Sequence, residues 1–462
     1  MSELQLFNSL TRETAPFRPR EGQGRKVRMY ACGPTVYNYA HIGNFRSFLY
    51  GDLLRRALRF FAFDVESVMN FTDVDDKTIR GAREAKLPLG EFTKKYIDEF
   101  QADMAALGIL PQDHQPRATE YVPQMVALIE RLVAKGLAYA AGDGSVYFRI
   151  AALPDYGKLA RLDKSGLQPG ARVAQDEYQK ETVGDFVLWK AWTADDGEVG
   201  WESPWGKGRP GWHIECSAMA MALLGEELDL HIAGIDLLFP HHENEIAQSE
   251  GATGKPFVRC WGHCAHLLVD GQKMSKSLGN LYTVRDVAAK GYNGRELRLV
   301  LLKTHYRQTF NFTWESLDEA RENLDRIDNW TGRWKNADSA SFDPQHRTGI
   351  AFLEAFTAAL GDDLNLSGAL GHLFDFVRDT NRLMDEKKSL PDLPAIWAKV
   401  DSVLGLGERK VEIPDAVRAL GERRAAARAE KNWKDSDALR AELEALGWTV
   451  RDGAKGQELV RI

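Results

Sequence analysis

The chain has 462 residues, which is long enough for two to four domains with a core each. Its formal net charge of −7, from 60 basic and 67 acidic residues, excludes a global positive field, so a bound nucleic acid would need a local basic patch. The sequence has no run of 18 apolar residues and no apolar signal core at the N-terminus, so we expect a cytoplasmic protein that does not enter a membrane.

The first predicted elements form a βαβ unit. A strand at about 27–32 ends at Cys32, a long amphipathic helix follows at about 44–63, and a second strand covers about 65–71. Polar residues follow both strands, at the edge where open α/β sheets bind ligands. The unit lacks a Gly-x-Gly-x-x-Gly fingerprint, so dinucleotide binding has little support.

The pattern changes after about residue 112. A helix predicted at 119–135 is followed by a hairpin signal at 142–144, which indicates an insertion between two halves of one sheet. The core resumes with a strand at 228–232, and Pro240 is predicted to start a helix.

The last third of the chain is predicted to be helical. A capping box fits 316–319, and apolar residues at helical spacing continue over 352–383. A final helix, followed by a strand-like tail, carries six basic residues: Arg418, Arg423, Arg424, Arg428, Lys431 and Lys434. By charge alone, an ordinary solvated helix face is the more probable interpretation of these residues.

Two short motifs indicate nucleotide chemistry. The tetrapeptide from His41 to Asn44 lies where a strand gives way to a helix, so backbone N–H groups and the helix dipole can face an anion there. Lys273 and Lys276 place two ammonium groups three residues apart, which suits a loop that closes on a triphosphate. Either motif alone is weak, but both in this order indicate chemistry at an α-phosphate.

Four dispersed residues offer a candidate metal shell. Four cysteines, at positions 32, 216, 260 and 264, are too few for a disulfide framework in so long a chain. Cys32 and Cys216 could join His241 and Glu245, which are four residues apart and share a helix face, in a set of donors that suits Zn²⁺. His242 could replace His241. Spacing alone slightly favours buried cysteines and a solvated Glu245 over a metal site.

Two other sets of residues have simpler explanations. One lies in a strand-like segment: Cys260, His263, Cys264 and His266. Alternation along a strand would split these residues between two faces, so core packing is expected for both cysteines. The other set is acidic: Asp73, Asp75 and Asp76. A helix N-cap and solvated charges in a first turn explain it as well as a magnesium site does.

The motifs together resemble those of the class I aminoacyl-tRNA synthetases, and among them the cysteine–tRNA ligases. Six segments carry the resemblance: CGPTVY at 32–37, HIGN at 41–44, NFTDVDDK at 70–77, GRPGWHIECS at 208–217, FPHHENE at 239–245 and KMSKSLGN at 273–280. The likeness runs from about residue 5 to the end. Several of these segments are long and specific to the family, so chance is a poor explanation.

This resemblance implies an α/β fold: a Rossmann-like catalytic domain with a connective insertion, then a helical bundle and a small mixed anticodon-binding module. The implied bounds are 1–112 and 205–265 for the catalytic halves, 113–204 for the insertion, 266–312 for a stem-contact region with the lysine loop, 313–408 for the bundle and 409–462 for the module. Nothing in the sequence suggests an extensive apolar interface, so we expect a monomer.

The implied function is ATP-dependent attachment of L-cysteine to tRNA(Cys) through a cysteinyl-adenylate. One Zn²⁺ per chain would select the thiolate over the serine hydroxyl without an editing domain. The resemblance selects His241 rather than His242, and the implied zinc ligands are Cys32, Cys216, His241 and Glu245. The implied cysteine pocket is formed by Thr72, Trp212 and His231. The implied contacts to ATP, bound with Mg²⁺, are His41, Asn44, Asp236, Lys273 and Lys276, of which all but Asp236 would be catalytic.

One residue departs from the general pattern of the class, which has histidine at position 44. The Asn44 amide can still donate to a phosphate but has no titratable proton, so we expect activity with little pH dependence from this position. Two alternatives remain: the cysteine ligase of mycothiol biosynthesis, which should lack an anticodon-reading end, and an inactive RNA-binding relative. The basic helix and Trp433, on which an anticodon base could stack, favour tRNA, and the intact lysine motif argues against inactivity.

Overall fold

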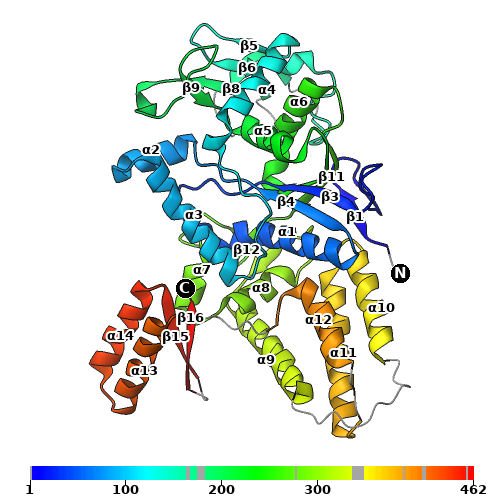
Figure 1. The fold of residues 1–462 in the computed structure, drawn as a ribbon, viewed down its shortest axis with the longest axis vertical. Helices are drawn as coiled ribbons and strands as arrows, with labels where there is room; N and C mark the ends of the chain where they lie inside the picture. The colour runs from blue at the N-terminus through cyan, green and yellow to red at the C-terminus, as the bar shows by residue number, and fades with distance from the viewer. Residues whose placement is uncertain are drawn as a thin grey trace.

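The structure is a computed structural model of the chain (Figure 1). It describes residues 3–162, 167–173, 183–275, 278–335, 348–388, 390, 392–407, 413–453 and 456–461.

A parallel sheet is the centre of the described chain. Its strand order is β11 (Val258–Cys264), β10 (Leu228–Gly234), β3 (Lys26–Ala31) and β4 (Asp64–Met69). Helix α1 (Ile42–Phe60) covers one face of this sheet, and α5 (Trp212–Leu224) and α6 (Glu243–Thr253) pack on the other side (Figure 1). The predicted βαβ unit is therefore confirmed.

Alternation along β3 explains how one strand serves both layers. Val27, Met29 and Ala31 are buried in the hydrophobic cluster that contains α1, whereas Tyr30 is buried in the cluster that contains α5 and α6. Successive side chains of a strand point to opposite faces, so a strand buried on both faces reads as a nearly continuous apolar run.

A second sheet lies above the parallel sheet in Figure 1. Among the described residues its strands are β5 (Ala138–Ala140), β6 (Val146–Phe148), β7 (Leu167–Val173), β8 (Val183–Ala191) and β9 (Gly208–Pro210). The predicted hairpin is confirmed, because β5 and β6 pair antiparallel around residues 142–144, and α4 (Val122–Ala134) precedes it. Two helices, α2 (Asp76–Ala85) and α3 (Leu89–Ala106), connect the parallel sheet to this region.

The remaining elements of the upper part are short. The N-terminal hairpin consists of β1 (Gln5–Asn8) and β2 (Glu13–Pro16). A small sheet follows β11, with strands β12 (Leu267–Val269), β13 (Gln272–Lys273) and β14 (Phe310–Phe312). Helices α7 (Val284–Ala289) and α8 (Gly294–Leu302) lie between β13 and β14 in the sequence.

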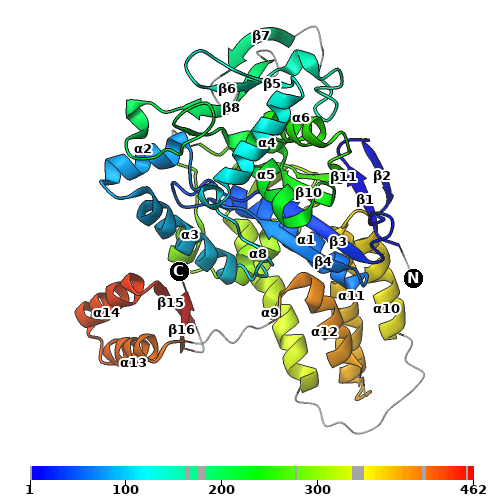
Figure 2. The ribbon, with the colours of Figure 1, turned by 45° about the horizontal axis from the view of Figure 1, so that its top comes forward.

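A helical bundle extends below the sheets (Figures 1 and 2). Its described helices are α9 (Glu315–Lys335), α10 (Thr348–Gly361), α11 (Leu366–Asp385) and α12 (Leu393–Leu404). A separate C-terminal module contains α13 (Asp415–Ala429), α14 (Trp433–Ala445), β15 (Trp448–Gly453) and β16 (Gly456–Arg461). Figure 2 shows this module beside the bundle rather than packed within it.

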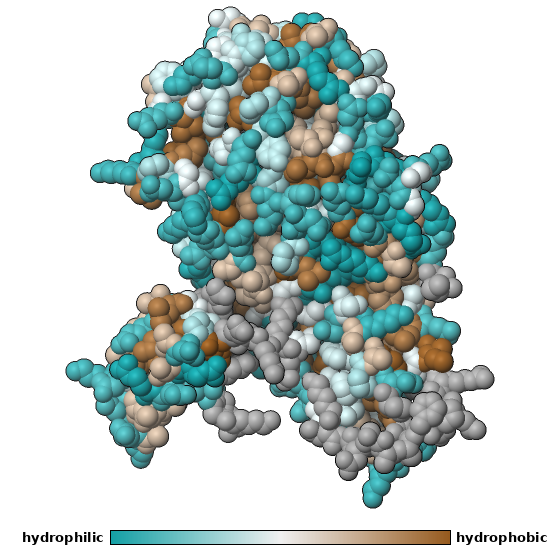
Figure 3. Space-filling model, viewed as in Figure 1, coloured by the Kyte–Doolittle hydropathy of each residue, from teal (hydrophilic) through white to brown (hydrophobic). Residues whose placement is uncertain are grey.

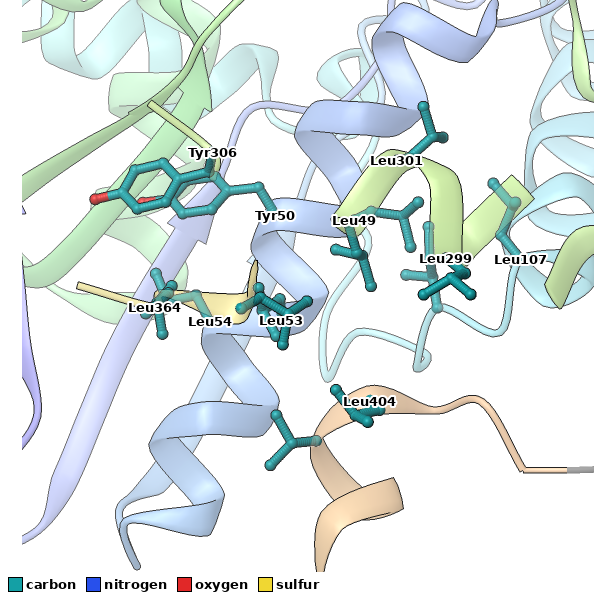
Figure 4. Close-up of a cluster of buried hydrophobic side chains, with 14 of the residues drawn as sticks. Leu49, Tyr50, Leu53, Leu54, Leu107, Leu299, Leu301, Tyr306, Leu364 and Leu404 are labelled. Atoms are coloured by element: carbon teal, nitrogen blue, oxygen red, sulfur yellow. The ribbon is translucent and has the colours of Figure 1, made fainter. Parts of the chain in front are cut away.

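Leucines and two tyrosines fill the junction between α1, α8 and the bundle (Figure 4). Leu53 of α1, Leu299 of α8 and Leu404 of α12 belong to one buried cluster. Polar groups are enclosed there too: the Asp52 carboxylate lies 2.7 Å from Arg298 and 2.8 Å from Arg56, and all three side chains are buried. The sheet layer and the bundle are therefore joined by a shared core.

Pro240 begins a helical run, as expected: within the π-helical turn over Leu238–His242, Phe239 is extended (φ −142°, ψ 133°), and the helical backbone from Pro240 continues into α6. Two other sequence expectations need correction. Helix α9 begins at Glu315, so Ser316 lies inside the helix, and its hydroxyl donates to the carbonyl of Thr313 at 2.5 Å instead of capping the next residues. Arg424 is buried and pairs with Asp452 at 3.0 Å, so it is no part of a solvated face.

Candidate active site

Four side chains from distant parts of the sequence converge at the carboxyl edge of the parallel sheet. One potential ligand atom from each of Cys32, Cys216, His241 and Glu245 lies within 4.8 Å of the others, and all four residues are buried. Cys32 follows β3, Cys216 lies in α5, His241 lies in the π-helical turn and Glu245 lies in the first turn of α6. A strand end and the starts of two helices therefore build the cluster.

The separations of these atoms suit a single small ion. The Cys32 Sγ atom lies 3.9 Å from Cys216 Sγ and 3.8 Å from a Glu245 carboxylate oxygen, and His241 Nε2 lies 3.1 Å from that same oxygen. Tetrahedral zinc with bonds of ~2.0–2.3 Å places its ligand atoms roughly 3.3–3.8 Å apart. Two sulfurs, one imidazole nitrogen and one carboxylate oxygen are also a donor set that Zn²⁺ accepts. The residues present thus fit the implied metal.

The charges in the cluster stabilise one another. Burial raises the pKa of Glu245, but His231 and His241 outweigh it and lower that pKa to about 2. Burial likewise lowers the pKa of His241, but Cys216 and Glu245 raise it to about 10. Burial also raises the pKa of Cys216, and its contacts with Cys32 and His241 lower it to about 6. Without a metal the cluster therefore holds a proton on His241 that an incoming cation would displace.

A second group of histidines surrounds the cluster. His231 Nε2 lies 3.0 Å from the other Glu245 carboxylate oxygen, and His213 Nδ1 lies 3.0 Å from His241 Nδ1. Partners of this kind fix the orientation of metal ligands. His213 was not among the predicted site residues, although it lies three residues before Cys216.

His242 belongs to an alternative set of donors. One potential ligand atom from each of His242, Cys32, His231 and Glu245 also lies within 4.8 Å of the others, so these residues form a second possible donor set. The His242 Nδ1 atom lies 2.9 Å from His263 Nε2. Burial, followed by the neighbouring His231 and His263, holds the pKa of His242 well below its ordinary value. His242 is therefore a neutral imidazole directed partly toward His263.

The three residues expected at a cysteine pocket lie next to the cluster. The Thr72 hydroxyl donates to Glu215 at 2.8 Å, and Glu215 precedes Cys216. The Trp212 indole stacks on His241 with ring centroids 4.4 Å apart and is partly exposed. His231 is fully buried. Its ring stacks on Trp261 with centroids 4.7 Å apart, and its Nε2 contacts the Glu245 carboxylate.

The motif at 41–44 forms the start of α1. His41 is the N-cap, and its Nδ1 accepts from the Asn44 N–H at 3.2 Å, while the Asn44 side-chain oxygen accepts from the His41 N–H at 3.1 Å. The Asn44 side chain therefore caps the helix, a role that the sequence analysis did not foresee. Asp236 is exposed after β10, and its charge partly offsets the effect of burial, which lowers the pKa of His41.

The lysine loop returns to this helix start. Lys273 is exposed on β13, and its carbonyl accepts from the Asn280 side chain at 3.3 Å. The chain then pairs with the helix start, where the Ile42 N–H donates to the Tyr282 carbonyl at 2.8 Å. Lys276 lies outside the described residues.

The competing metal sets do not assemble among the described residues. Cys260 and Cys264 are buried apart from the cluster, and burial raises their pKa values to about 12 and about 11. The three acidic residues have protein partners instead. Asp73 accepts from Thr119, Asp75 caps α2, and Asp76 pairs with Arg209 and Lys190. Core packing accounts for the two cysteines and helix capping for Asp75, whereas Asp73 is buried and Asp76 is ion-paired rather than merely solvated.

Comparisons with protein families cover nearly the whole chain. The model of the class I tRNA synthetase (C) catalytic domain matches residues 19–322, the DALR domain matches 355–408, and the cysteinyl-tRNA ligase anticodon binding domain matches 410–459. The cysteine–tRNA ligase of Chlamydia muridarum is 46% identical over 477 aligned positions, covering 100% of both chains. The chain belongs to the cysteine–tRNA ligase family.

Other members of the family and of its class agree with this assignment. The cysteine–tRNA ligase of Chlamydia caviae is 46% identical and covers 100% of this chain and 98% of its own. Methionyl-tRNA synthetase of Mycobacterium tuberculosis, solved with methionyl-adenylate, has the same fold, with a TM-score of 0.60, 16% identity and coverage of 83% of this chain and 88% of its own. No helix among the described residues of this cysteine–tRNA ligase family member is both long and apolar enough to cross a membrane.

Proposed function

We propose that the protein attaches L-cysteine to tRNA(Cys), using ATP and a cysteinyl-adenylate intermediate, with Zn²⁺ at the cluster of Cys32, Cys216, His241 and Glu245. The observation that carries this proposal is the convergence of these four donors inside a catalytic domain of the family. A bound Zn²⁺ would supply a site for a thiolate sulfur, which the harder and less acidic serine hydroxyl matches poorly.

The protein side chains would hold the amino acid around this site. Trp212 supplies a partly exposed aromatic wall against His241, and Thr72 is fixed by its bond to Glu215. His231 would hold Glu245 in the orientation that a metal requires. A purely apolar pocket separates such close analogues as cysteine and serine by only about 10²-fold, so the donor cluster would provide the remaining selectivity.

The nucleotide would bind at the start of α1. In the first step a carboxylate oxygen of cysteine attacks the α-phosphorus of ATP, the bond to the bridging oxygen of the β-phosphate breaks, and pyrophosphate leaves. His41 and Asn44 would donate to phosphate oxygens, Lys273 and Lys276 would stabilise the pyrophosphate, and Asp236 would accept from the ribose. Mg²⁺ would accompany ATP. In the second step a terminal ribose hydroxyl of the tRNA attacks the acyl carbon, and AMP leaves.

The C-terminal module would read the anticodon. Trp433 is 56% exposed, and the Arg428 guanidinium lies 5.6 Å from its ring centroid, so an unpaired base could stack there. Replacing Trp433 with alanine should therefore raise the KM for tRNA without changing the melting temperature. This RNA-reading end also favours tRNA over an aminosugar as the acceptor of cysteine.

The domain bounds are also part of this proposal. We place the catalytic halves at 1–112 and 205–265, the insertion at 113–204, the stem-contact region at 266–312, the bundle at 313–408 and the module at 409–462. The sheet of the insertion continues to β9 at Gly208–Pro210. We also propose a cytoplasmic monomer; the face in Figure 3 is mostly hydrophilic, with small separate hydrophobic patches.

Three measurements on the purified protein test the function. Cysteine-dependent exchange of pyrophosphate into ATP tests the first step, and charging of a tRNA(Cys) transcript tests the second. Zinc analysis of the unaltered protein should give one ion per chain. Absence of exchange would contradict the proposal outright, whereas exchange with transfer to an aminosugar but not to tRNA would support the mycothiol alternative.

A further inference from the structure

Asp363 lies in the turn between α10 and α11 and links this turn of the bundle to the sheet layer. The residue is 3% exposed, and its carboxylate accepts from the Tyr306 hydroxyl and the Arg307 guanidinium, each at 2.6 Å, and from the Phe7 N–H at 2.8 Å. Its carbonyl accepts from the His305 ring at 2.8 Å. One residue of the bundle therefore holds the side chains of residues 305–307, which lie in the connection from α8 to β14.

The same connection holds Arg46, in the first turn of α1. The Arg46 side chain is buried, and its guanidinium donates to four backbone carbonyls at 2.6–3.4 Å, those of Ala265, Leu301, His305 and Gln308. Two of the four acceptors thus belong to the segment next to Asp363. A buried donor without an acceptor is unfavourable, so the position of Arg46 follows that of this segment. Because Arg46 lies two residues after Asn44, the segment fixes the helix start that carries the motif of residues 41–44.

The connection also leads into the small sheet that carries Lys273. Strand β14 follows it directly and pairs parallel with β12, where Asn311 lies opposite Leu268. On its other side β12 pairs with β13, where Leu268 lies opposite Lys273. Just before β12, the Ala265 N–H donates to the Tyr306 carbonyl at 2.7 Å. Two of the groups proposed to bind ATP, the motif of residues 41–44 and Lys273, are therefore supported by one segment that Asp363 holds.

We infer that Asp363 is a positioning residue for ATP: it holds residues 305–308, which in turn fix Arg46 at the start of α1 and β14 beside the strands that lead to Lys273. The inference rests on the proposed function and adds a residue of the bundle to the support of the nucleotide site, since Asp363 lies within the DALR match at 355–408 and outside the catalytic-domain match at 19–322. The donor cluster is built by β3, α5 and α6 instead, and α5 and α6 pack on the side of the sheet opposite α1. ATP binding and cysteine binding should therefore respond differently to changes at Asp363.

Pyrophosphate exchange by Asp363→Asn tests this difference. The substitution keeps the shape of the side chain and removes the charge that pairs with Arg307, whose side chain is 39% exposed and can turn to solvent. The KM for ATP should rise about tenfold, because the bond between the two charged groups is lost, whereas the KM for cysteine and the zinc content should stay unchanged. An unchanged KM for ATP, or equal rises for both substrates, would overturn the inference, whereas absence of exchange in the unaltered protein would instead contradict the proposed function.

Two further variants separate positioning from a general loss of stability. Tyr306→Phe removes one donor to Asp363 but keeps the ring that stacks on Tyr50 with centroids 4.3 Å apart (Figure 4), so it should raise the KM for ATP about threefold and leave the KM for cysteine unchanged. An unchanged KM for ATP in Tyr306→Phe would overturn the inference even if Asp363→Asn did not fold. Asp385→Asn is the matched control, because it breaks an ion pair with Arg333 in the same bundle and the Asp385 side chain is 70% exposed. It should leave both KM values unchanged, and a rise in the KM for ATP equal to that in Asp363→Asn would overturn the inference.

Binding of ATP without turnover tests the route through Arg46. Arg46→Lys keeps a positive charge but loses the planar fork that reaches several carbonyls, so the Kd for ATP should rise. If Asp363 acts through Arg46, the protein with both substitutions should show a rise in Kd that is smaller than the product of the two single rises. Equilibrium dialysis with ATP and Mg²⁺ compares the unaltered protein, the two single variants and the double variant. A rise equal to the product of the single rises would overturn the inference.

Discussion

At the scale of single residues, the four cysteines are all buried and differ in the groups that lie next to them. All four thiols are buried, yet Cys32 and Cys216 face each other across 3.9 Å beside charged donors, whereas Cys260 and Cys264 have carbonyl oxygens for neighbours. Burial raises the pKa values of Cys32, Cys260 and Cys264. For Cys216, burial is outweighed by the contacts with Cys32 and His241, which lower its pKa to about 6. The same residue type thus lies in a cluster of potential metal donors in one place and in the core in another.

This contrast predicts different results for two matched substitutions. Cys216→Ser should weaken zinc binding beyond the ~10–100-fold typical of an outer partner and should raise the KM for cysteine, because one of four donors is lost. Cys260→Ser changes an equally buried thiol outside the cluster and should retain the metal. Chelator competition and metal analysis check both variants, and equal zinc content in Cys216→Ser and the unaltered protein would exclude Cys216 as a ligand.

Asn44 caps helix α1 and is also proposed to contact ATP, and two substitutions separate these two roles. Asn44→Ala removes the acceptor of the His41 N–H and should cost about 0.5–1 kcal/mol of stability. Asn44→Asp keeps that acceptor but adds a negative charge facing the triphosphate, so stability should be retained while the KM for ATP rises about tenfold. Thermal melting and pyrophosphate exchange check the pair. A near-neutral kinetic pKa that disappears in Asn44→Ala would contradict the expected absence of a titrating group at this position.

At the scale of elements, the sequence predicted β3, α1, β4 and β10 of the catalytic core within a few residues. Period-2 and period-3.6 patterns are strong where an element has one buried face, as in β3 and α1. They miss the start of α9, where Thr313 rather than Ser316 makes the first hydrogen bonds: the Thr313 hydroxyl accepts from the Ser316 N–H at 3.3 Å, and the Thr313 carbonyl accepts from the Ser316 hydroxyl at 2.5 Å.

In the candidate site, the four donor residues were predicted from the sequence, but hydrogen-bond partners such as His213 were not. The residues named as ligands could be found because motif resemblance supplied their grouping, whereas spacing alone favoured separate buried side chains. His213, which lies one helical turn before Cys216, had a sequence signal, whereas nothing in the sequence shows that His263 is aimed at His242 rather than at the core. The capping role of Asn44 followed only from the geometry at the start of α1.

Helix α3 carries a titratable group that should make stability depend on pH. Burial raises the pKa of Asp103 to about 7, and only 3% of the residue is exposed. Because this pKa is raised in the folded state, the favourable contribution of the neutral group is complete below about pH 4 and is lost as the pH rises through 7. The free energy of unfolding should therefore fall between these values, by an amount on the order of a few kcal/mol.

The substitution Asp103→Asn tests this dependence. The variant should have a flatter profile of unfolding free energy against pH between 4 and 8 and should be more stable than the unaltered protein at pH 8. Urea unfolding at several pH values measures both quantities. Identical slopes in the two proteins would show that Asp103 does not titrate in this range.

At the scale of the whole molecule, a buried ionic junction holds the bundle to the sheet layer. Asp52 of α1 binds Arg298 of α8, and Arg298 also donates to the Leu404 carbonyl at the end of α12 at 2.7 Å. The stacked rings of Tyr50 and Tyr306 and the leucines of Figure 4 surround these polar groups. The junction therefore joins the bundle to the helix that begins at the motif of residues 41–44.

Asp52→Asn should therefore destabilise the protein strongly. Removing the carboxylate charge leaves buried guanidinium groups with no counter-charge, at a cost of about 3–5 kcal/mol. Asp98→Asn, which breaks an exposed pair with Lys94 on α3, should cost less than about 1 kcal/mol. Denaturant midpoints of the two variants check the difference, and similar midpoints would contradict a structural role for the junction.

The C-terminal module has a core of its own, formed by Val417, Leu443, Trp448 and Val450, with Ile413, Leu420 and Leu459 around it. All of these residues belong to the module, and a unit of this size buries too little apolar surface for high stability. Calorimetry should consequently record two endotherms, with the smaller one at the lower temperature. At temperatures between the two endotherms, the protein would still activate cysteine but would no longer bind the anticodon loop.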